Sequence, residues 1–325
     1  MLIRPELAAL RSDDAAQRRA QAAMGAALAR WRATPIVAAA DAELAQWGSG
    51  AELDDLSLLS ALFSGDHDAA PRFCTELVAV ILAELARDPL GQSPLRHYCD
   101  DAVASITLLR HGTTVLSLQA IDGSGLARAA PPQSARFAPC ETWEAVLAGS
   151  ARAERLAIAG PCPGGVAIER SRIAIRPGLA LHRIGLAETL HLDDVPSSLV
   201  LLRMQRRTGC SAVTSEYALD DGALLHQAAS SPRDSRLELT AALLGRMGRE
   251  DAAPLLAAMA EERGNPSLRW QVLRECLALD TATGFATLCR IAGDGNDPLA
   301  AHAGALRDQL IETYPQLAGA SRCPA

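Results

Sequence analysis

The chain has 325 residues, a formal net charge of −7 at pH 7 and 49% hydrophobic residues, but only 3% aromatic residues. Its 31 lysine and arginine positions are all arginine. Guanidinium neither deprotonates nor acts as an amine nucleophile, so Schiff-base and pyridoxal-phosphate enzymes are excluded. Walker A phosphate loops, protein-kinase sites and Ser-x-x-Lys acyl-transfer sites are excluded for the same reason. The acidic balance also argues against a nucleic-acid partner.

The compartment is predicted from the N-terminus and the cysteines. Residues 1–19 mix acidic residues with arginines and lack the apolar core of a signal peptide. No apolar run is long enough to span a bilayer. The eight cysteines include no Cys-x-x-Cys pair, and a chain of this length does not need disulfides. We therefore expect a cytoplasmic protein with reduced thiols and no membrane partner.

Residues 1–97 form the first of three predicted domains, and their pattern is helical. Thr34 and Pro35 are typical of an N-cap and the first residue of a helix. Alanine supplies about one residue in five of the whole chain, well above ordinary usage, and much of it falls in such segments. Apolar periodicity predicts helices at residues 7–31, 35–47, 52–63 and 71–85.

Residues 98–230 are predicted to be the second domain, which is rich in β-structure. Short apolar segments there are separated by turn signals such as Asp122-Gly123 and Pro177-Gly178. About eight short strands with regular turns are typical of a small barrel or sandwich. A short helix is a further possibility at residues 141–147. The strand candidates include residues 106–109, 115–121, 155–159, 166–175, 179–184 and 199–204.

Residues 231–325 return to a helical pattern and form the third predicted domain. Ser235 and Glu238 have the spacing of a capping box. Asn265-Pro266 and Asp297-Pro298 each combine an N-cap residue with a first-turn proline, and they recur 32 residues apart. The predicted fold class is therefore α+β, with N-terminal helices, a central barrel- or sandwich-like β-domain and C-terminal helical repeats.

Residues 235–314 resemble a short HEAT-type repeat array. The resemblance implies a scaffold whose concave face binds a protein or peptide. Arg269, Trp270 and Arg274 are the candidate partner-binding residues, because an aromatic side chain flanked by arginines is typical of an interface anchor. The alternative is that Trp270 fills the seam between two helix pairs.

His182, Glu188 and His191 combine two imidazoles with a carboxylate, a ligand set suited to a divalent metal. A β-barrel with such ligands resembles a cupin, which implies a metal-dependent enzyme holding iron, zinc or manganese. The first cupin motif has two histidines one residue apart, whereas Arg183 and Ile184 follow His182 here. The alternative is that both histidines are structural or lie on the surface.

Arg203, Arg206 and Arg207 cluster near the end of a predicted strand. Guanidinium groups bind carboxylates and phosphates through paired hydrogen bonds, so the cluster predicts a site for a small anion. The alternative is an exposed strand end whose charge is balanced by nearby carboxylates.

No Ser-His-Asp order, nucleophile elbow, dinucleotide fingerprint or His-Glu-x-x-His motif is present, so no catalytic residue is assigned. The leading hypothesis is a non-catalytic binding or scaffold protein without a cofactor, which recognises a protein or peptide. The alternative is a cupin-like metal-dependent enzyme acting on a small molecule. A small anionic ligand and a homodimer are further expectations.

Overall fold

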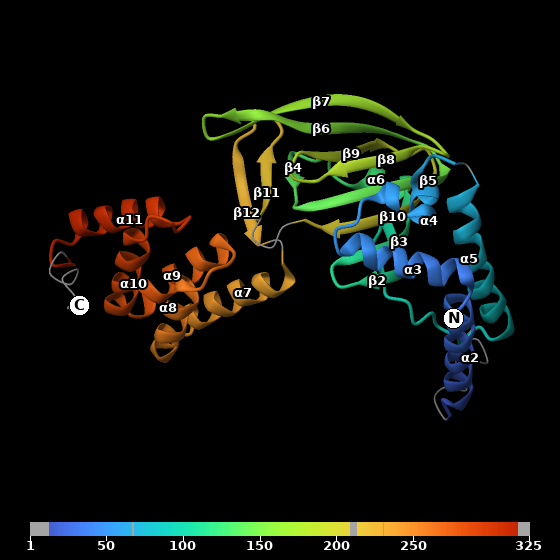
Figure 1. The fold of residues 1–325 in the computed structure, drawn as a ribbon, viewed down its shortest axis with the longest axis horizontal. Helices are drawn as coiled ribbons and strands as arrows, with labels where there is room; N and C mark the ends of the chain where they lie inside the picture. The colour runs from blue at the N-terminus through green and yellow to red at the C-terminus, as the bar shows by residue number, and fades with distance from the viewer. Residues whose placement is uncertain (1–12, 67, 209–212, 230, 318–325) are drawn as a thin grey trace. The chain divides into compact units, whose positions relative to one another are not determined.

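The computed structural model describes residues 13–66, 68–208, 213–229 and 231–317, which are a mixture of helix and sheet as predicted. The chain divides into two compact units (Figure 1). The first contains Met1–Ala135, Cys140–Pro161 and Ala167–Arg207, and the second contains Arg136–Pro139, Cys162–Val166 and Thr208–Ala325. The division into domains 1–97, 98–230 and 231–325 stays a prediction.

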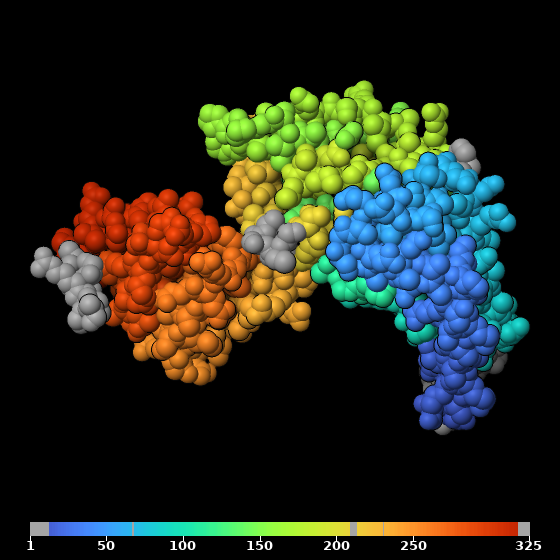
Figure 2. Space-filling view, viewed as in Figure 1, coloured from blue at the N-terminus to red at the C-terminus, as the bar shows by residue number. Residues whose placement is uncertain are grey.

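The first unit begins with a group of helices that agree with the helical pattern of the sequence. Thr34 is extended and Pro35 starts a helix, as predicted, but the Thr34 hydroxyl donates to the Trp31 carbonyl (2.8 Å) instead of capping the helix. The part of the first predicted helix that precedes residue 13 lies outside the described residues. In the space-filling view these helices form a continuous blue to cyan surface (Figure 2). They are α2 (Ala15–Arg32), α3 (Pro35–Gly48), η1 (Leu53–Asp55), α4 (Ser57–Phe63) and α5 (Ala69–Arg87).

Two sheets complete the first unit. The larger has the order β1-β2-β3-β10-β5-β8 with antiparallel neighbours, and the smaller has the order β7-β6-β9. Their strands are β1 (His97–Cys99), β2 (Val103–His111), β3 (Thr114–Asp122), β5 (Cys140–Gly149), β6 (Ala151–Cys162), β7 (Gly165–Ile175), β8 (Ala180–Ile184), β9 (Glu188–Asp194) and β10 (Ser198–Arg207). A short helix, α6 (Gly123–Arg128), follows β3.

Neither sheet closes on itself within the described residues, so the barrel-like prediction is wrong and the sandwich alternative applies. The helix considered at residues 141–147 is also wrong, because this segment is part of β5. Trp143 and Ala145 pack in the core beneath the helices, while Val146 packs in the core between the sheets. A strand buried on both faces has a nearly continuous apolar run, which periodicity cannot distinguish from a buried helix.

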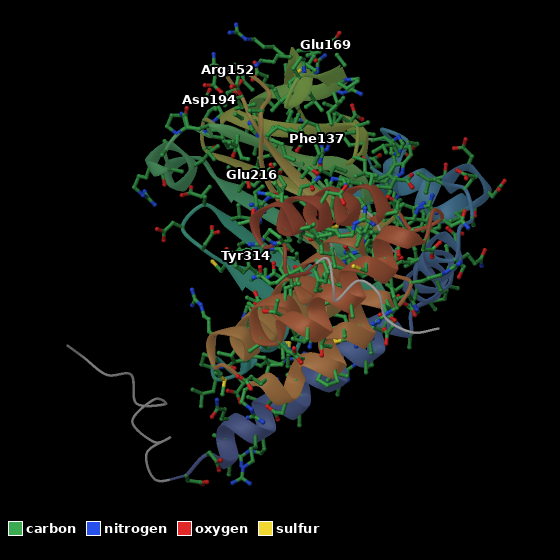
Figure 3. All side chains as sticks on the ribbon, turned by 90° about the vertical axis from the view of Figure 1, so that its left-hand side faces the viewer. Phe137, Arg152, Glu169, Asp194, Glu216 and Tyr314 are labelled. Carbon is green, nitrogen blue, oxygen red and sulfur yellow. The ribbon has the colours of Figure 1, made fainter. Side chains whose placement is uncertain are left out.

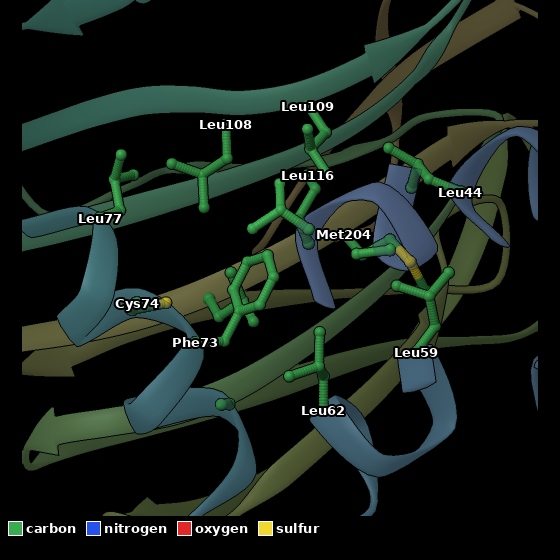
Figure 4. Packing of buried hydrophobic residues seen from close by; sticks show 14 of the residues in the cluster. Leu44, Leu59, Leu62, Phe73, Cys74, Leu77, Leu108, Leu109, Leu116 and Met204 are labelled. Atoms are coloured by element: carbon green, nitrogen blue, oxygen red, sulfur yellow. The ribbon is translucent and has the colours of Figure 1, made fainter. Parts of the chain in front are cut away.

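The larger sheet is therefore the middle of three layers. On one face, Leu116 and Met204 pack against Leu44 and Phe73 from the helices (Figure 4). On the other face, a second core joins it to the smaller sheet, with members including Val146, Leu201, Ala153 and Ile175. Burial of both faces positions the side chains of β5 and β10 rigidly, which matters for the polar groups described below.

The second unit combines a small sheet with a helical array. The sheet has the order β12-β11-β4 and is formed by β4 (Ser134–Phe137), β11 (Val213–Ala218) and β12 (Leu224–Ala229). The helical array contains α7 (Pro232–Arg246), η2 (Glu250–Ala252), α8 (Ala253–Glu261), α9 (Pro266–Leu279), α10 (Thr281–Gly293) and α11 (Ala300–Thr313). Its core includes Leu256, Leu273, Phe285 and Leu288. The helices after residue 231 confirm the helical prediction, whereas their assignment to the HEAT type stays a prediction.

The helix starts in this array agree only partly with the sequence signals. Asn265 caps α9 as predicted, and its side chain accepts a hydrogen bond from the Ser267 amide (2.9 Å). Ser231, not Ser235, caps α7, because Pro232 takes the first helical position. Asp297 precedes α11 without capping it. None of the described helices is both long and apolar enough to cross a membrane.

Candidate functional site

Strand alternation divides the polar side chains of β5, β8 and β10 between the two faces of the larger sheet. Trp143 and Met204 belong to the core beneath the helices, and Val146 and Leu201 to the core between the sheets. Residues two positions apart along a strand share a face. One polar group therefore lies toward the helices and a second lies toward the smaller sheet.

Arg206 belongs to the group that faces the helices. Its Nε donates to Glu141 Oε2 (2.7 Å), and its Nη1 donates to the carbonyl oxygens of Trp47 (2.8 Å) and Ala51 (3.2 Å). The guanidinium carbon also lies 4.6 Å from the centroid of the Trp47 ring, a cation–π arrangement. Arg206 thus ties the end of α3 to the sheet, and its donors are used within the fold. The predicted role of Arg206 in anion binding does not fit this geometry.

His182 lies in the same group. Its Nε2 is 3.0 Å from Glu141 Oε1, and its ring stacks on Trp143 with centroids 4.0 Å apart. Burial raises the pKa of Glu141, but hydrogen bonds from Trp143, Arg206 and His182 outweigh it and the pKa is lowered overall. The carboxylate is therefore held ionised as the hub of this group.

The group on the inward face consists of Glu144, Arg183 and Arg203, which we call the inner cluster. Arg203 lies directly across from Glu144 on β10, and Arg183 lies diagonally from it on β8. Arg183 Nη1 is 2.7 Å from Glu144 Oε2, and Arg203 Nε is 3.6 Å from Glu144 Oε1. The side chains of Glu144 and Arg183 are 6% and 13% exposed, respectively. Two guanidinium groups thus converge on one buried carboxylate.

Hydrogen bonding in the inner cluster is incomplete. Arg203 Nε is buried and has no hydrogen-bond partner, because Glu144 Oε1 lies 3.6 Å away. Arg183 Nη1 is at ion-pair distance from Glu144 but is not aligned for a hydrogen bond with it. Arg207, four residues after Arg203, shares its face of β10 by alternation. Of the three arginines predicted to bind an anion, Arg203 and Arg207 therefore share one face of β10, about 13 Å apart along the strand, and Arg206 lies on the other face.

The three predicted metal ligands lie on different faces of the two sheets. His182 faces the helices, as described above. Glu188 and His191 both belong to β9, but three residues separate them, so their side chains point to opposite faces. Leu190 packs in the core between the sheets, which assigns Glu188 to the inward face and His191 to the outward face. The proposed set does not converge on one point.

Each of these side chains also has its own environment. Glu188 forms an ion pair with Arg155, and His191 lies across from Glu154 of β6. Burial lowers the pKa of His191, while Glu154 and Asp193 raise it less. Among the residues that the structure describes, no group of three or more His, Cys, Asp or Glu side chains has a geometry able to hold a metal ion. The described residues therefore do not fit iron, zinc or manganese.

The three predicted partner-binding residues have different surroundings in the helical array. Arg269 is buried, donates from Nε to the Ala260 carbonyl (2.7 Å) and pairs with Asp297. It is an internal contact, so the prediction of an interface anchor is wrong for this residue. Trp270 packs against the core of the array and meets His302 edge to face (centroids 6.3 Å apart), which favours the seam alternative.

Arg274 is exposed and borders an open cavity of about 520 Å³. Apolar groups from α9 and α11 form most of its walls, among them Leu277, Leu306 and Leu310. Tyr314, labelled in Figure 3, lies at the border and is 50% exposed. Arg274 is the predicted partner-binding residue that a ligand can reach.

Glu141, Glu144 and Arg183 were not identified as site residues from the sequence. Both glutamates fall in the segment considered as a helix, where they appear as isolated surface charges. A signal was available in β8, where Arg183 follows Leu181 by two residues and so shares its inward face. Only the pairing of β5 with β8 and β10 brings the three charges of the inner cluster together.

Comparisons with known proteins give matches among solved structures only. No family model matches the chain, and no curated protein matches its sequence. A provisionally assigned mannose-6-phosphate isomerase from Ralstonia eutropha is 18% identical, with 36% of this chain and 94% of that chain covered and a TM-score of 0.25. An oxalate decarboxylase is 10% identical, covering 38% and 30% of the two chains, with a TM-score of 0.24. Vicilin from Corylus avellana (hazelnut) is 11% identical, covering 38% and 33%, with a TM-score of 0.26. Superpositions this limited carry no argument about the fold or the function of this chain.

Proposed function

We propose that the first unit binds a small molecule bearing a carboxylate or a phosphate at the inner cluster of Glu144, Arg183 and Arg203. The observation that carries the proposal is the excess of positive charge. Two guanidinium groups face a single carboxylate, and Arg203 Nε is buried without a hydrogen-bond partner.

The energetic cost of this arrangement supports a ligand. A buried polar group without a hydrogen bond costs about 1–3 kcal/mol, and more when it is charged. A buried charge is ordinarily paired. A bound anion would balance the charge of the second guanidinium and accept a hydrogen bond from Arg203 Nε, whereas a neutral or cationic ligand would not balance the charge.

The chemistry of guanidinium narrows the ligand class. Its planar fork of donors matches the oxygens of carboxylates and phosphates, and it keeps its charge at every physiological pH. Like the cupin-like alternative, this proposal has a small molecule as the ligand. It includes no metal, because the described His, Cys, Asp and Glu residues form no metal-binding group.

The test is the thermal stability of the intact protein with inorganic phosphate, with succinate and with chloride at matched ionic strength. Phosphate or succinate at a concentration of 100 times its Kd would stabilise the native state by about 2.7 kcal/mol, and chloride would not. Arg203→Met should abolish the response. Arg152→Met is the matched control, because Arg152 lies at the sheet margin beside Asp194 (3.0 Å, Figure 3). An equal response to chloride, or an unchanged response of Arg203→Met, refutes the proposal.

A second candidate function, peptide recognition by the helical array, is favoured by the cavity that Arg274 borders. Apolar walls beside one exposed cation fit a peptide with leucine-like side chains next to a carboxylate. This is the scaffold hypothesis with a single binding residue in place of three. A fluorescein-labelled Leu-Glu-Leu-Leu-Glu peptide should bind in an anisotropy assay, and Leu-Arg-Leu-Leu-Arg should not. Arg274→Glu should reverse that preference; equal binding of both peptides rejects the hypothesis.

A further inference from the structure

Helix α7 carries an exposed apolar stripe formed by Leu239, Leu243 and Met247. These side chains are 71%, 57% and 57% exposed, respectively. They are spaced four residues apart, so they lie above one another on one face of the helix. Contiguous apolar surface of this kind on a soluble protein marks an interaction site more often than scattered exposed residues do.

The stripe is not the face that α7 uses within its own unit. Ala241 is buried and Leu237 packs against the same core, and both lie on the side of the helix roughly opposite Leu243. Gly248, with φ of +64°, ends the helix just after Met247. The stripe therefore has a defined length and is available to a partner.

Opposite charges lie beyond the two ends of the stripe. Arg236 precedes it and Glu250 follows it, and both are exposed. Arg236 Nε donates to the Pro232 carbonyl (2.9 Å), but neither side chain forms an ion pair within the described part of the chain. Both charges are thus available for contacts with another molecule.

The sequence positions in this face are symmetric about Leu243. Leu239 and Met247 are each four residues from it, and Arg236 and Glu250 are each seven residues from it. Seven residues make nearly two helical turns, so Arg236 lies on the same face as Leu243, and Glu250 follows in η2 directly after the helix. A surface with this symmetry is complementary to an antiparallel copy of itself.

We infer that a second copy of this chain docks on the stripe, with a two-fold axis passing through Leu243. In this arrangement Leu239 packs on Met247 of the second copy, and Arg236 pairs with Glu250 of the second copy. Each contact occurs twice, as expected of a two-fold interface. The inference is independent of anion binding by the first unit, because every residue involved belongs to the second unit.

The size of the stripe sets the strength of the interaction. Three apolar side chains and two charges on each copy make an interface smaller than the standard area of about 1,600 Å². We therefore expect a reversible dimer, and its dissociation should be visible on dilution. The end charges determine the orientation, because a parallel arrangement places Arg236 beside Arg236 and Glu250 beside Glu250.

Sedimentation velocity of the full chain over a concentration series from about 1 to 500 µM tests the inference. The unmodified protein should change from monomer to dimer, and Leu243→Arg should stay monomeric. Leu82→Arg is the matched control, since Leu82 is 59% exposed on α5 of the first unit. Circular dichroism checks that each variant is folded. A monomer at every concentration, or a dimer that is unaffected by Leu243→Arg or lost in Leu82→Arg, overturns the inference.

Charge exchange tests the two-fold geometry separately. Arg236→Glu and Glu250→Arg should each weaken dimerisation about tenfold or more, because each places two pairs of like charges together. The double variant should recover the original affinity. An equimolar mixture of the two single variants should form heterodimers in preference to either homodimer. Failure of the double variant to recover, with Leu243→Arg still monomeric, rejects this arrangement of the two copies.

Discussion

Replacing Arg269 with leucine should destabilise the second unit, because this side chain is an internal clamp. Arg269 is 4% exposed and joins three segments of the helical array. Its Nε donates to the Ala260 carbonyl at the end of α8 (2.7 Å), and its Nη1 donates to Asp297 Oδ1 before α11 (3.0 Å). Nη2 makes a second bond to the other oxygen of Asp297, so the pair is bidentate.

The expected loss follows from what leucine leaves behind. Removing one partner of a buried ion pair costs about 3–5 kcal/mol, because the remaining charge is buried without compensation. Asp297 is 11% exposed and keeps a hydrogen bond from the Leu299 amide (2.9 Å), which places the loss near the lower value of about 3 kcal/mol. Replacing Asp297 with leucine as well removes the uncompensated charge. The double variant Arg269→Leu/Asp297→Leu should therefore be more stable than Arg269→Leu alone.

Urea unfolding followed by 19F NMR of protein labelled with 5-fluorotryptophan measures the stability of the second unit separately from that of the first. The chain has four tryptophans, and Trp270 is the one located in the second unit. The unfolding midpoint reported by the Trp270 resonance should move to a lower urea concentration in Arg269→Leu. The midpoints reported by the other three tryptophans should not change. A loss below about 1 kcal/mol, or a double variant less stable than the single one, would refute the reasoning from a buried ion pair.

Three further predictions concern pH and backbone geometry. Hydrogen bonding to Arg269 lowers the pKa of Asp297 below 3.8, so the stabilisation it gives is present above pH 3.8 and lost as the pH falls through the folded-state pKa. Urea midpoints should show this loss in the unmodified protein and a smaller loss in Arg269→Leu, where the Leu299 amide still lowers the pKa. Burial lowers the pKa of His191 below 6.5, so the first unit should lose stability as the pH falls below 6.5. The loss should be at most about 1.4 kcal/mol per pH unit, and His191→Gln should reduce this slope in pH-dependent unfolding. Gly149 has φ of +80° and a Cβ there would lie 1.8 Å from the Ser198 carbonyl oxygen, so Gly149→Ala should cost more than about 2 kcal/mol in thermal unfolding.

Local signals predicted the parts of the fold that depend on neighbouring residues. Pro35 and the Asn265-Pro266 pair fix helix starts through their own backbone chemistry, which needs no distant contact. The turn at Pro177-Gly178 likewise separates β7 from β8, with φ of +81° at Gly178. By contrast, β5 is buried on both faces, and its burial depends on layers formed by other segments of the first unit.

The candidate site was harder to predict because strand pairing assembles it. Glu188 and His191 are an odd number of positions apart on one strand, so alternation alone argues against a shared metal site once that strand is recognised. Glu144 and Arg203 are 59 positions apart in sequence and meet only through the β5–β10 register. No property of either residue alone indicates that contact, and this is why composition and motif searches did not identify the inner cluster.

Because Arg203 and Arg206 lie on opposite faces of β10, replacing each of them with methionine should affect stability and anion binding differently. Arg206→Met removes the donor for the Trp47 and Ala51 carbonyls and leaves Glu141 without its guanidinium, so the first unit should lose about 3 kcal/mol. Arg203→Met removes a guanidinium whose Nε has no hydrogen-bond partner, so stability should stay within about 1 kcal/mol while the response to phosphate is lost. Thermal unfolding of both variants with and without phosphate separates the two roles. If Arg203→Met destabilises as strongly as Arg206→Met, the inner cluster is a structural contact, and the excess charge that motivates anion binding is already balanced within the fold.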